Sequence, residues 1–228
     1  MTDAPKNPAV KETLRKLVPP AMLKERGAIL RLGPTAGPIY ARLRLLDWLG
    51  IRSGNAALVP PRARSFLFVC FGNLMRSPMA EVMFRRSIAG TSLPRIQVAS
   101  AGLHAIPGTP AHPWAVTASA ELGLSLAGHR ARPLTAEMVS AADAIFAMDF
   151  QNKAELLAQY ADSKDKILML SAYAVGGQHC REIPDPYFGN LSTTQQCYSI
   201  LQKCVENLTA ALVTAERQQM TLESGVAR

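Results

Sequence analysis

Residues 65–81 read S-F-L-F-V-C-F-G-N-L-M-R-S-P-M-A-E, and they specify the centre of the fold. Ser65 to Val69 is an apolar run rich in β-forming side chains, which predicts a buried strand. Gly72 and Asn73 tolerate positive φ, so the chain can curl there. Pro78 suits the first turn of a helix, which we expect to continue to Ile88. The stretch therefore predicts a strand, a curled loop and a helix in direct succession.

The curled loop is predicted to bind a tetrahedral oxyanion. Backbone N–H groups of such a loop point inward, and the helix N-terminus adds partial positive charge. Arg76 can hold two oxygens of a phosphate with its planar fork of donors. The same field favours a thiolate at Cys70, so a nucleophile is expected to face the anion. The predicted phosphate-binding residues are Phe71, Gly72, Asn73, Leu74, Met75, Arg76 and Ser77.

Cys70 alone would be weak evidence for catalysis. A single cysteine at the end of a strand is usually an inert buried side chain. A cysteine and an arginine separated by five residues, as Cys70 and Arg76 are, form a weak pattern by themselves. The pattern gains specificity because Gly-Asn lies inside the loop, Ser-Pro follows it, and a strand and a helix flank it. The combination favours a nucleophile and a phosphate loop.

The segment C-F-G-N-L-M-R-S-P-M-A-E, residues 70–81, resembles the phosphate loop of the low-molecular-weight protein tyrosine phosphatases. The usual pattern of that family is C-x-G-N-x-C-R-S-P. The chain departs from it at Met75, which stands where a second cysteine is usual. V-A-S-A-G-L, residues 98–103, resembles the S-A-G segment of the family. The resemblance covers about Phe66 to Leu212.

Asp185 is the candidate for a second catalytic group. When a thiolate attacks phosphorus, a carboxylic acid on a nearby loop can protonate the leaving oxygen and then activate water. Asp185 follows the fourth predicted strand, and loops at the carboxyl ends of parallel strands meet at one edge. An Asp-Pro pair alone indicates only a turn. The surrounding D-P-Y-F-G, residues 185–189, however resembles a D-P-Y/F motif of the family.

The resemblance implies an α/β fold with a four-stranded, mostly parallel sheet and helices on both faces, in the flavodoxin-like three-layer arrangement. It implies hydrolysis of phosphotyrosine and small aryl phosphates through a phosphocysteine intermediate. In that reaction Cys70 is the nucleophile, Arg76 binds phosphate and Asp185 is the general acid and base. No metal and no cofactor are expected, because the histidines lack metal-ligand spacing and neither a Walker-type loop nor a dinucleotide fingerprint is present.

Residues around the loop are expected to support it and to shape the substrate cleft. The resemblance implies that Ser100 and Ser77 hold Asn73 in a left-handed conformation. Phosphotyrosine specificity requires apolar walls around the phosphate loop. The candidate walls are Phe71, Leu74, His104, Tyr187 and Phe188.

Two other functions are compatible with the same motifs. An arsenate reductase of this fold would need resolving cysteines, but the corresponding segment, roughly residues 139–150, has none. Cys197 and Cys204 come too late in the chain for that role. A non-catalytic phosphotyrosine-binding regulator is the second alternative. The joint presence of Cys70, Arg76 and Asp185 argues against it.

Strands and helices are predicted to alternate after residue 65, which is typical of a parallel sheet. The further predicted strands are Ile96–Ser100, Ala144–Met148 and Lys166–Leu170. The further predicted helices are Ala111–Leu122, Leu134–Ala142, Gln151–Tyr160, with Asp149 as its cap, and Ser192 to about Arg217.

The composition indicates an intracellular globular protein. The chain has 228 residues, of which 48% are hydrophobic, and no apolar run approaches the ~18 residues of a membrane span. Its four cysteines, Cys70, Cys180, Cys197 and Cys204, do not form a disulfide framework, so we expect a reducing cytoplasm. The resemblance implies a phosphotyrosine-containing protein as partner, such as a bacterial tyrosine kinase, and the S-A-G-L loop, which resembles the bacterial type, fits this expectation. No nucleic-acid partner is expected.

The net charge of +8 lies entirely in the first 64 residues. They hold 12 Lys and Arg against 4 Asp and Glu, whereas residues 65–228 hold 13 of each. Three helices are predicted in this segment, followed by a linker at 53–64. The helices are Pro8–Val18, Pro20–Leu32 and Pro38–Leu49.

This basic extension is predicted either to contact an acidic partner or an anionic membrane surface, or to pack on the catalytic domain. The predicted division is therefore a basic helical extension and linker at 1–64, a phosphatase domain at 65–218 and a flexible tail at 219–228.

Overall fold

In the computed structural model, the described residues are 20–51, 59–60, 62–93, 95–174 and 181–226. Within them, four strands form one parallel sheet in the order β2–β1–β3–β4. The strands are β1 (Ser65–Cys70), β2 (Gln97–Gly102), β3 (Ala144–Ala147) and β4 (Ile167–Met169). The predicted α/β class and the four-stranded parallel sheet are confirmed.

The central strand β1 explains why the sheet is covered on both faces. Phe66 and Phe68 point into one cluster of buried side chains, whereas Leu67 and Val69 point into another. Alternate residues of a strand face opposite sides of the sheet, so a fully apolar strand requires helices on both sides.

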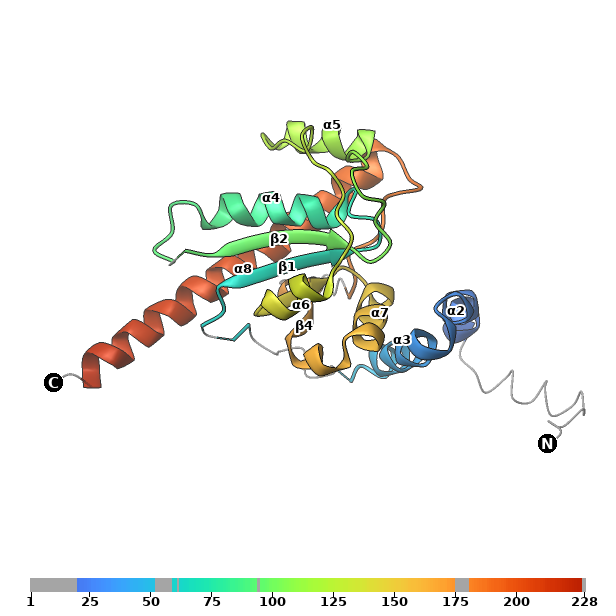
Figure 1. Cartoon of the computed structure of the whole chain (residues 1–228), viewed down its shortest axis with the longest axis horizontal. Coiled ribbons are helices and arrows are strands. Elements are labelled where there is room, and N and C mark those ends of the chain that lie inside the picture. The colour runs from blue at the N-terminus through green and yellow to red at the C-terminus, as the bar shows by residue number, and fades with distance from the viewer. Residues whose placement is uncertain (1–19, 52–58, 61, 94, 175–180, 227–228) are drawn as a thin grey trace, which may run out of the picture.

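Helices α4, α5 and α8 cover the face of Phe66 and Phe68, and α6 and α7 cover the opposite face (Figure 1). The bounds of these helices are α4 (Arg76–Ile88), α5 (Pro113–Glu121), α6 (Ala136–Ala141), α7 (Phe150–Gln159) and α8 (Leu191–Val226). Short 3-10 helices precede and follow β4, at Ala161–Lys166 and Leu170–Tyr173.

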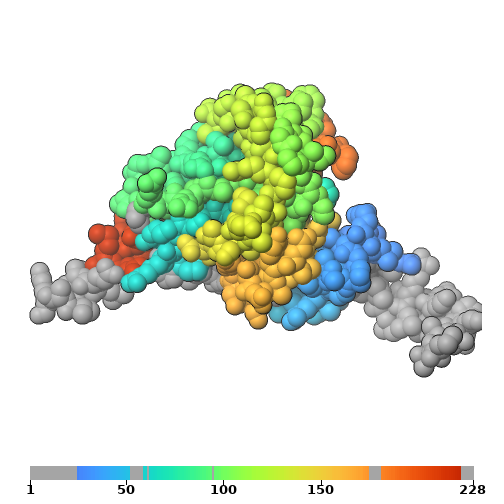
Figure 2. Space-filling view, in the orientation of Figure 1, coloured from blue at the N-terminus to red at the C-terminus, as the bar shows by residue number. Residues whose placement is uncertain are grey.

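The described part of the extension is a pair of helices, α2 (Pro20–Arg31) and α3 (Gly33–Trp48), that continues the layer of α7. Tyr40 of α3 is fully buried in the same cluster as Leu156 of α7. Figure 2 shows the blue surface of the extension joined to the orange surface of the α7 region. The extension therefore packs on the catalytic part of the chain. The domain boundary at residue 65 stays a prediction.

Several predicted bounds were wrong. Helix α3 begins at Gly33 and carries Pro38 in its interior, whereas we expected it to begin at Pro38. A proline at the first turn of a helix and one inside it look alike in sequence. Helix α8 runs on to Val226, so most of the segment predicted as a flexible tail is helical. The predicted helix 8–18 and most of the predicted linker 53–64 lie outside the described residues.

None of the described helices is both long enough and apolar enough for a membrane crossing.

Candidate active site

The loop after β1 places the sulfur of Cys70 at the N-terminus of α4. The Sγ atom of Cys70 lies 3.0 Å from Oγ of Ser77, and the backbone N–H of Asn73 donates to it at 3.3 Å. Cys70 and Ser77 are both buried. The hydrogen bonds and the partial positive charge of the helix N-terminus thus act on the same sulfur atom. The arrangement therefore fits a nucleophile.

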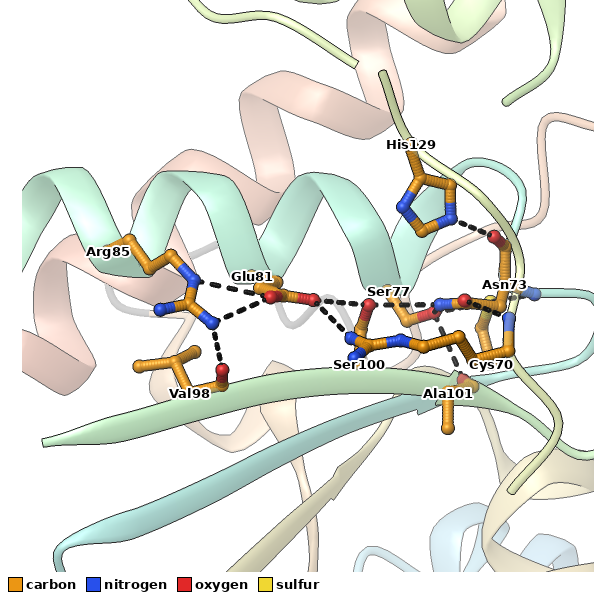
Figure 3. A network of polar contacts seen from close by, with 10 residues as sticks. Cys70, Asn73, Ser77, Glu81, Arg85, Val98, Ser100, Ala101 and His129 are labelled. Carbon is orange, nitrogen blue, oxygen red and sulfur yellow. Dashed lines mark hydrogen bonds and ion pairs between the residues drawn. The ribbon is translucent and has the colours of Figure 1, made fainter. Parts of the chain in front are cut away.

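Asn73 anchors the curl of the loop. Its φ is 54°, and it is the one residue other than glycine with positive φ among those described. Its Nδ2 donates to Oγ of Ser77 at 2.9 Å and to Oγ of Ser100 at 3.0 Å, while its Oδ1 accepts from the backbone of Arg132 at 2.9 Å (Figure 3). The structure thus brings the three predicted loop-support residues into contact.

Gly102, which ends the S-A-G segment, lets β2 approach the loop closely. A Cβ atom at this position would lie only 2.8 Å from the backbone N of Asn73 and from the carbonyl oxygen of Phe71. The following backbone N–H groups of Leu103 and His104 donate to the carbonyls of Cys70 and Phe71. The glycine is therefore required by a backbone contact rather than by a turn.

Two supporting residues, His129 and Glu81, were not predicted for the site. His129 donates from Nε2 to the carbonyl oxygen of Asn73 at 2.7 Å. Glu81 accepts from the hydroxyl of Ser100 at 2.6 Å and pairs with Arg85 (Figure 3), and it also pairs with Arg132. Glu81 lies one helical turn after Ser77, a spacing that could have indicated a shared face. No periodic spacing in the sequence links His129 to Asn73.

Arg76 is buried and lies between two carboxylates. Its Nη1 donates to Oδ2 of Asp149 at 2.6 Å and to the carbonyl of Ile183 at 3.1 Å, and its Nη2 donates to Oδ2 of Asp185. Burial alone would lower the pKa of Arg76, but the charges of Asp149, Asp185 and Cys70 outweigh it and raise that pKa. The guanidinium therefore remains a cation, fixed in orientation.

Asp149 has two functions, of which the sequence indicated only one. Its Oδ1 accepts from the backbone N–H of Asn152 at 2.7 Å and caps α7, as predicted. Its Oδ2 holds Arg76. The available signal was position, because Asp149 closely follows β3 at the carboxyl edge of the sheet, where Cys70 and Asp185 also lie.

Asp185 lies beside the phosphate loop with a partly exposed side chain. The exposed fraction of the side chain is 44%. Its Oδ1 accepts from the backbone of Tyr187 at 3.1 Å, which leaves Oδ2 for Arg76. The preceding Ile183 is buried and donates its N–H to the carbonyl of Met148. The segment before Asp185, residues 181–184, is the stem of the acid loop. It is anchored in the core through Ile183 and carries an accessible carboxyl group at Asp185.

Exposed aromatic rings flank the loop. Phe71 and His104 form one pair, with ring centroids 4.5 Å apart, and His104 also pairs with Glu155. Tyr187 contacts His112 and the fully exposed Phe188, with centroid distances of 5.5 Å and 5.0 Å. Leu74 is partly buried against the core. Phe71, Tyr187 and Phe188 are thus exposed, whereas Leu74 is only partly exposed.

Met75 points into the core rather than toward the anion site. Its side chain is buried, and its carbonyl accepts from the hydroxyl of Tyr198 at 3.2 Å. Only the backbone of Met75 can therefore take part in the predicted phosphate binding. Cys197 and Cys204 are buried on α8, and Cys180 lies outside the described residues. The described residues contain no group of three or more potential metal ligands.

The model of the low molecular weight phosphotyrosine protein phosphatase family matches residues 65–219. The chain is 35% identical to the probable low molecular weight protein-tyrosine-phosphatase EpsP of Ralstonia nicotianae, over 63% of this chain and 92% of EpsP. It is 36% identical to the protein-arginine-phosphatase of Bacillus subtilis, over 64% of this chain and 95% of that protein.

A solved structure shows the same likeness. The tyrosine phosphatase Wzb from Escherichia coli K30, crystallised in complex with sulphate, superposes with a TM-score of 0.59 at 25% identity. The match covers 66% of this chain and 99% of Wzb.

Proposed function

The chain belongs to the low molecular weight phosphotyrosine protein phosphatase family, and we propose that Cys70, Arg76 and Asp185 carry out its reaction within residues 65–218. The enzyme is a protein-tyrosine-phosphatase. One observation supports these roles above all: the sulfur of Cys70 lies at the start of α4, beside a buried Arg76 that contacts Asp185. A nucleophile, an anion site and an acid thus meet at one edge of the sheet.

In the first step, the thiolate of Cys70 attacks phosphorus and the bond from phosphorus to the tyrosine oxygen breaks. Asp185 gives its proton to that oxygen, so the phenol leaves as a neutral molecule. The loop amides and Arg76 hold the three remaining phosphate oxygens throughout. The product of this step is a phosphocysteine and an ionised Asp185.

In the second step, Asp185 takes a proton from water, and the oxygen of that water attacks phosphorus. The bond between sulfur and phosphorus breaks, which releases inorganic phosphate and restores the thiolate. Asp185 is protonated again at the end of the cycle. The proton balance therefore closes without a further group.

In the structure, Nη2 of Arg76 pairs with the carboxylate of Asp185. A bound phosphate offers Arg76 two oxygens in a fork that matches the guanidinium. Arg76 then binds the substrate, and Asp185 is released toward the leaving oxygen. We infer that substrate binding itself frees the acid.

The acid role is tested with two leaving groups. Asp185→Asn should slow the hydrolysis of phenyl phosphate much more than that of nitrophenyl phosphate, because a leaving group of low pKa needs little protonation in the transition state. The control is Asp162→Asn, a change outside the site. An equal loss on both substrates would remove Asp185 from the acid role.

The substrate class is proposed from the aromatic walls. Phe71, His104 and Tyr187 can contact the ring of phosphotyrosine, and the relatives named as phosphatases favour hydrolysis over arsenate reduction. Phosphoarginine is the necessary comparison, because a protein-arginine-phosphatase is just as similar to this chain. We expect a phosphotyrosine peptide to have the higher kcat/KM. The reverse order would show that Leu74 and the aromatic walls do not select an aryl group.

We propose a protein substrate in a bacterial cytoplasm, such as a tyrosine kinase. The bacterial type of the S-A-G-L loop supports this proposal, and so does the absence of a disulfide framework in the cysteine pattern. Asp185→Ala should retain a tyrosine-phosphorylated protein in a pull-down, and free phosphotyrosine should release it.

We also propose that the basic extension contacts an acidic partner or an anionic membrane surface. The charge excess of the first 64 residues supports this, together with the exposed side chains of Trp48, Leu49 and Ile51 at the end of α3. Sedimentation of the full chain with phosphatidylglycerol vesicles tests binding to an anionic membrane, and phosphatidylcholine vesicles are the control. We expect the chain to bind the phosphatidylglycerol vesicles at low salt and to be released by high salt.

A further inference from the structure

Helix α3 of the extension contacts the short segment that leads into Asp185. The Nη1 atom of Arg44 lies 2.7 Å from Oε2 of Glu182. Three residues further along α3, Asp47 pairs with Arg181 at 2.9 Å, and its carbonyl accepts a second bond from the same guanidinium. Two ion pairs thus join the extension to consecutive residues of the stem of the acid loop.

Arg44 is held in place by its own helix. Its Nε donates to the hydroxyl of the fully buried Tyr40 at 3.0 Å, and that hydroxyl donates to Glu25 of α2. Hydrogen bonding to Tyr40 and the charges of Glu182 and Glu25 outweigh burial and raise the pKa of Arg44. Arg44 is therefore a fixed cation rather than a mobile surface charge.

Glu182, which pairs with Arg44, also contacts the start of α7. Its Oε1 accepts from the backbone N–H of Phe150 at 2.7 Å, and the guanidinium of Arg44 lies 5.2 Å from the centroid of the Phe150 ring. Burial raises the pKa of Glu182, while the Phe150 N–H and Arg44 oppose that effect. The carboxylate of Glu182 thus depends on Arg44 for its charge balance.

The two segments that Glu182 joins are the ones that hold Arg76. Phe150 directly follows Asp149, which pairs with Arg76, and Glu182 directly precedes Ile183, whose carbonyl also accepts from Arg76. Asp185 comes two residues later. A displacement of Glu182 would therefore move the segment that carries Asp185, whereas the ion pair with Asp149 would still hold Arg76.

We propose that Arg44 is a positioning residue of the phosphatase reaction, which holds Glu182 against the start of α7 and thereby sets the place of Asp185 over the phosphate loop. The proposal rests on the proposed acid role of Asp185. Arg44 touches neither substrate nor nucleophile, so its effect must appear in proton transfer to the leaving group. The extension then contributes to catalysis, in addition to any binding surface.

The test uses the full chain with Arg44→Met, which keeps most of the aliphatic packing and removes the charge. The matched control is Arg42→Met, since Arg42 is exposed on the same helix. We expect Arg44→Met to lower kcat on phenyl phosphate roughly tenfold and to change kcat on nitrophenyl phosphate less than about threefold. KM should change little for either substrate. Arg42→Met should leave kcat and KM unchanged on both substrates. Arg44→Lys should recover part of the kcat on phenyl phosphate that Arg44→Met loses.

A second variant covers a failure of Arg44→Met to fold. Glu182→Gln keeps a carbonyl oxygen for the Phe150 N–H and removes the partner charge of Arg44, so it should reproduce the same pattern. Asp185→Asn in the same two assays separates the possible failures. If Asp185→Asn affects both substrates equally, the proposed acid role is wrong. If Asp185→Asn discriminates but neither Arg44→Met nor Glu182→Gln does, the positioning role of Arg44 is wrong.

Discussion

Replacing Asn73 should show how much the loop depends on one side chain. Asn73 is fully buried, has positive φ and makes three side-chain hydrogen bonds, to Ser77, Ser100 and Arg132. Both Asn73→Gly and Asn73→Ala delete these bonds. Glycine accepts the left-handed conformation without strain, whereas alanine does not. The two variants therefore separate the side-chain network from the backbone strain.

The expected loss follows from the contacts. A hydrogen bond contributes a net ~0.5–1.5 kcal/mol to stability, so three lost bonds should lower the free energy of unfolding by roughly 1.5–4.5 kcal/mol in Asn73→Gly. Ser100 retains Glu81 as an acceptor and Ser77 retains Ala101, which favours the lower half of that range. Asn73→Ala should lose about 1 kcal/mol more, because of its positive φ.

Urea unfolding, followed by the fluorescence of Trp48 and Trp114, measures these differences. Because the side chain of Asn73 holds the curl that places its backbone N–H against the sulfur of Cys70, kcat/KM on nitrophenyl phosphate should fall by about 10²-fold in both variants. The control is Asn207→Ala, which loses one side-chain bond, to the carbonyl of Tyr173, far along α8. It should lose about 1 kcal/mol of stability and no activity.

Two results would refute this reasoning. If the free energy of unfolding of Asn73→Gly lies within about 0.5 kcal/mol of that of the parent, the side-chain network does not stabilise the loop. If Asn73→Ala is as stable as Asn73→Gly, the positive φ carries no cost.

Three further predictions concern single side chains. Cys70→Ser should remove nearly all activity on aryl phosphates, and activity within tenfold of the parent would contradict the nucleophilic role. Met75→Cys should increase the activity that dithiothreitol recovers after peroxide, because a nearby thiol can trap a sulfenic acid as a disulfide; full recovery in the parent would contradict this. Burial lowers the pKa of Lys153 from 10.5 to about 8, so the native state binds fewer protons than the unfolded state between these values. The free energy of unfolding of the parent, measured relative to that of Lys153→Met in urea titrations, should therefore rise from pH 8 to pH 10. A fall would show that burial does not disfavour the charged form of Lys153.

Local sequence could predict the phosphate loop because each of its parts is determined locally. An apolar run forms β1, Gly-Asn allows the curl, and Pro78 favours the first turn of α4. The position of Asp185 needed one topological rule, that loops at the carboxyl ends of parallel strands meet. These features required no knowledge of distant side chains.

The contacts of Arg76 and Asn73 could not be predicted in the same way. Asp149 shows the reason: capping α7 uses one carboxylate oxygen, and sequence cannot tell what meets the other. His129 reaches Asn73 from 56 residues away, through a loop that has no pattern of its own. Residues that act by long-range contact carry no periodic signal.

The charge of the extension shows a second limit of sequence. Counting by segment treats the basic residues before residue 65 as one exposed surface. In the structure, Arg44 pairs with Glu182 and Arg64 pairs with Glu216, so part of the excess is balanced by acids of the catalytic domain. Removal of α3 would leave the partly buried Glu182 without this cation, and burial already raises the pKa of that carboxyl group. The stem of the acid loop would then lose the charge that fixes it, so we expect residues 65–218 alone to hold Asp185 less firmly than the full chain does.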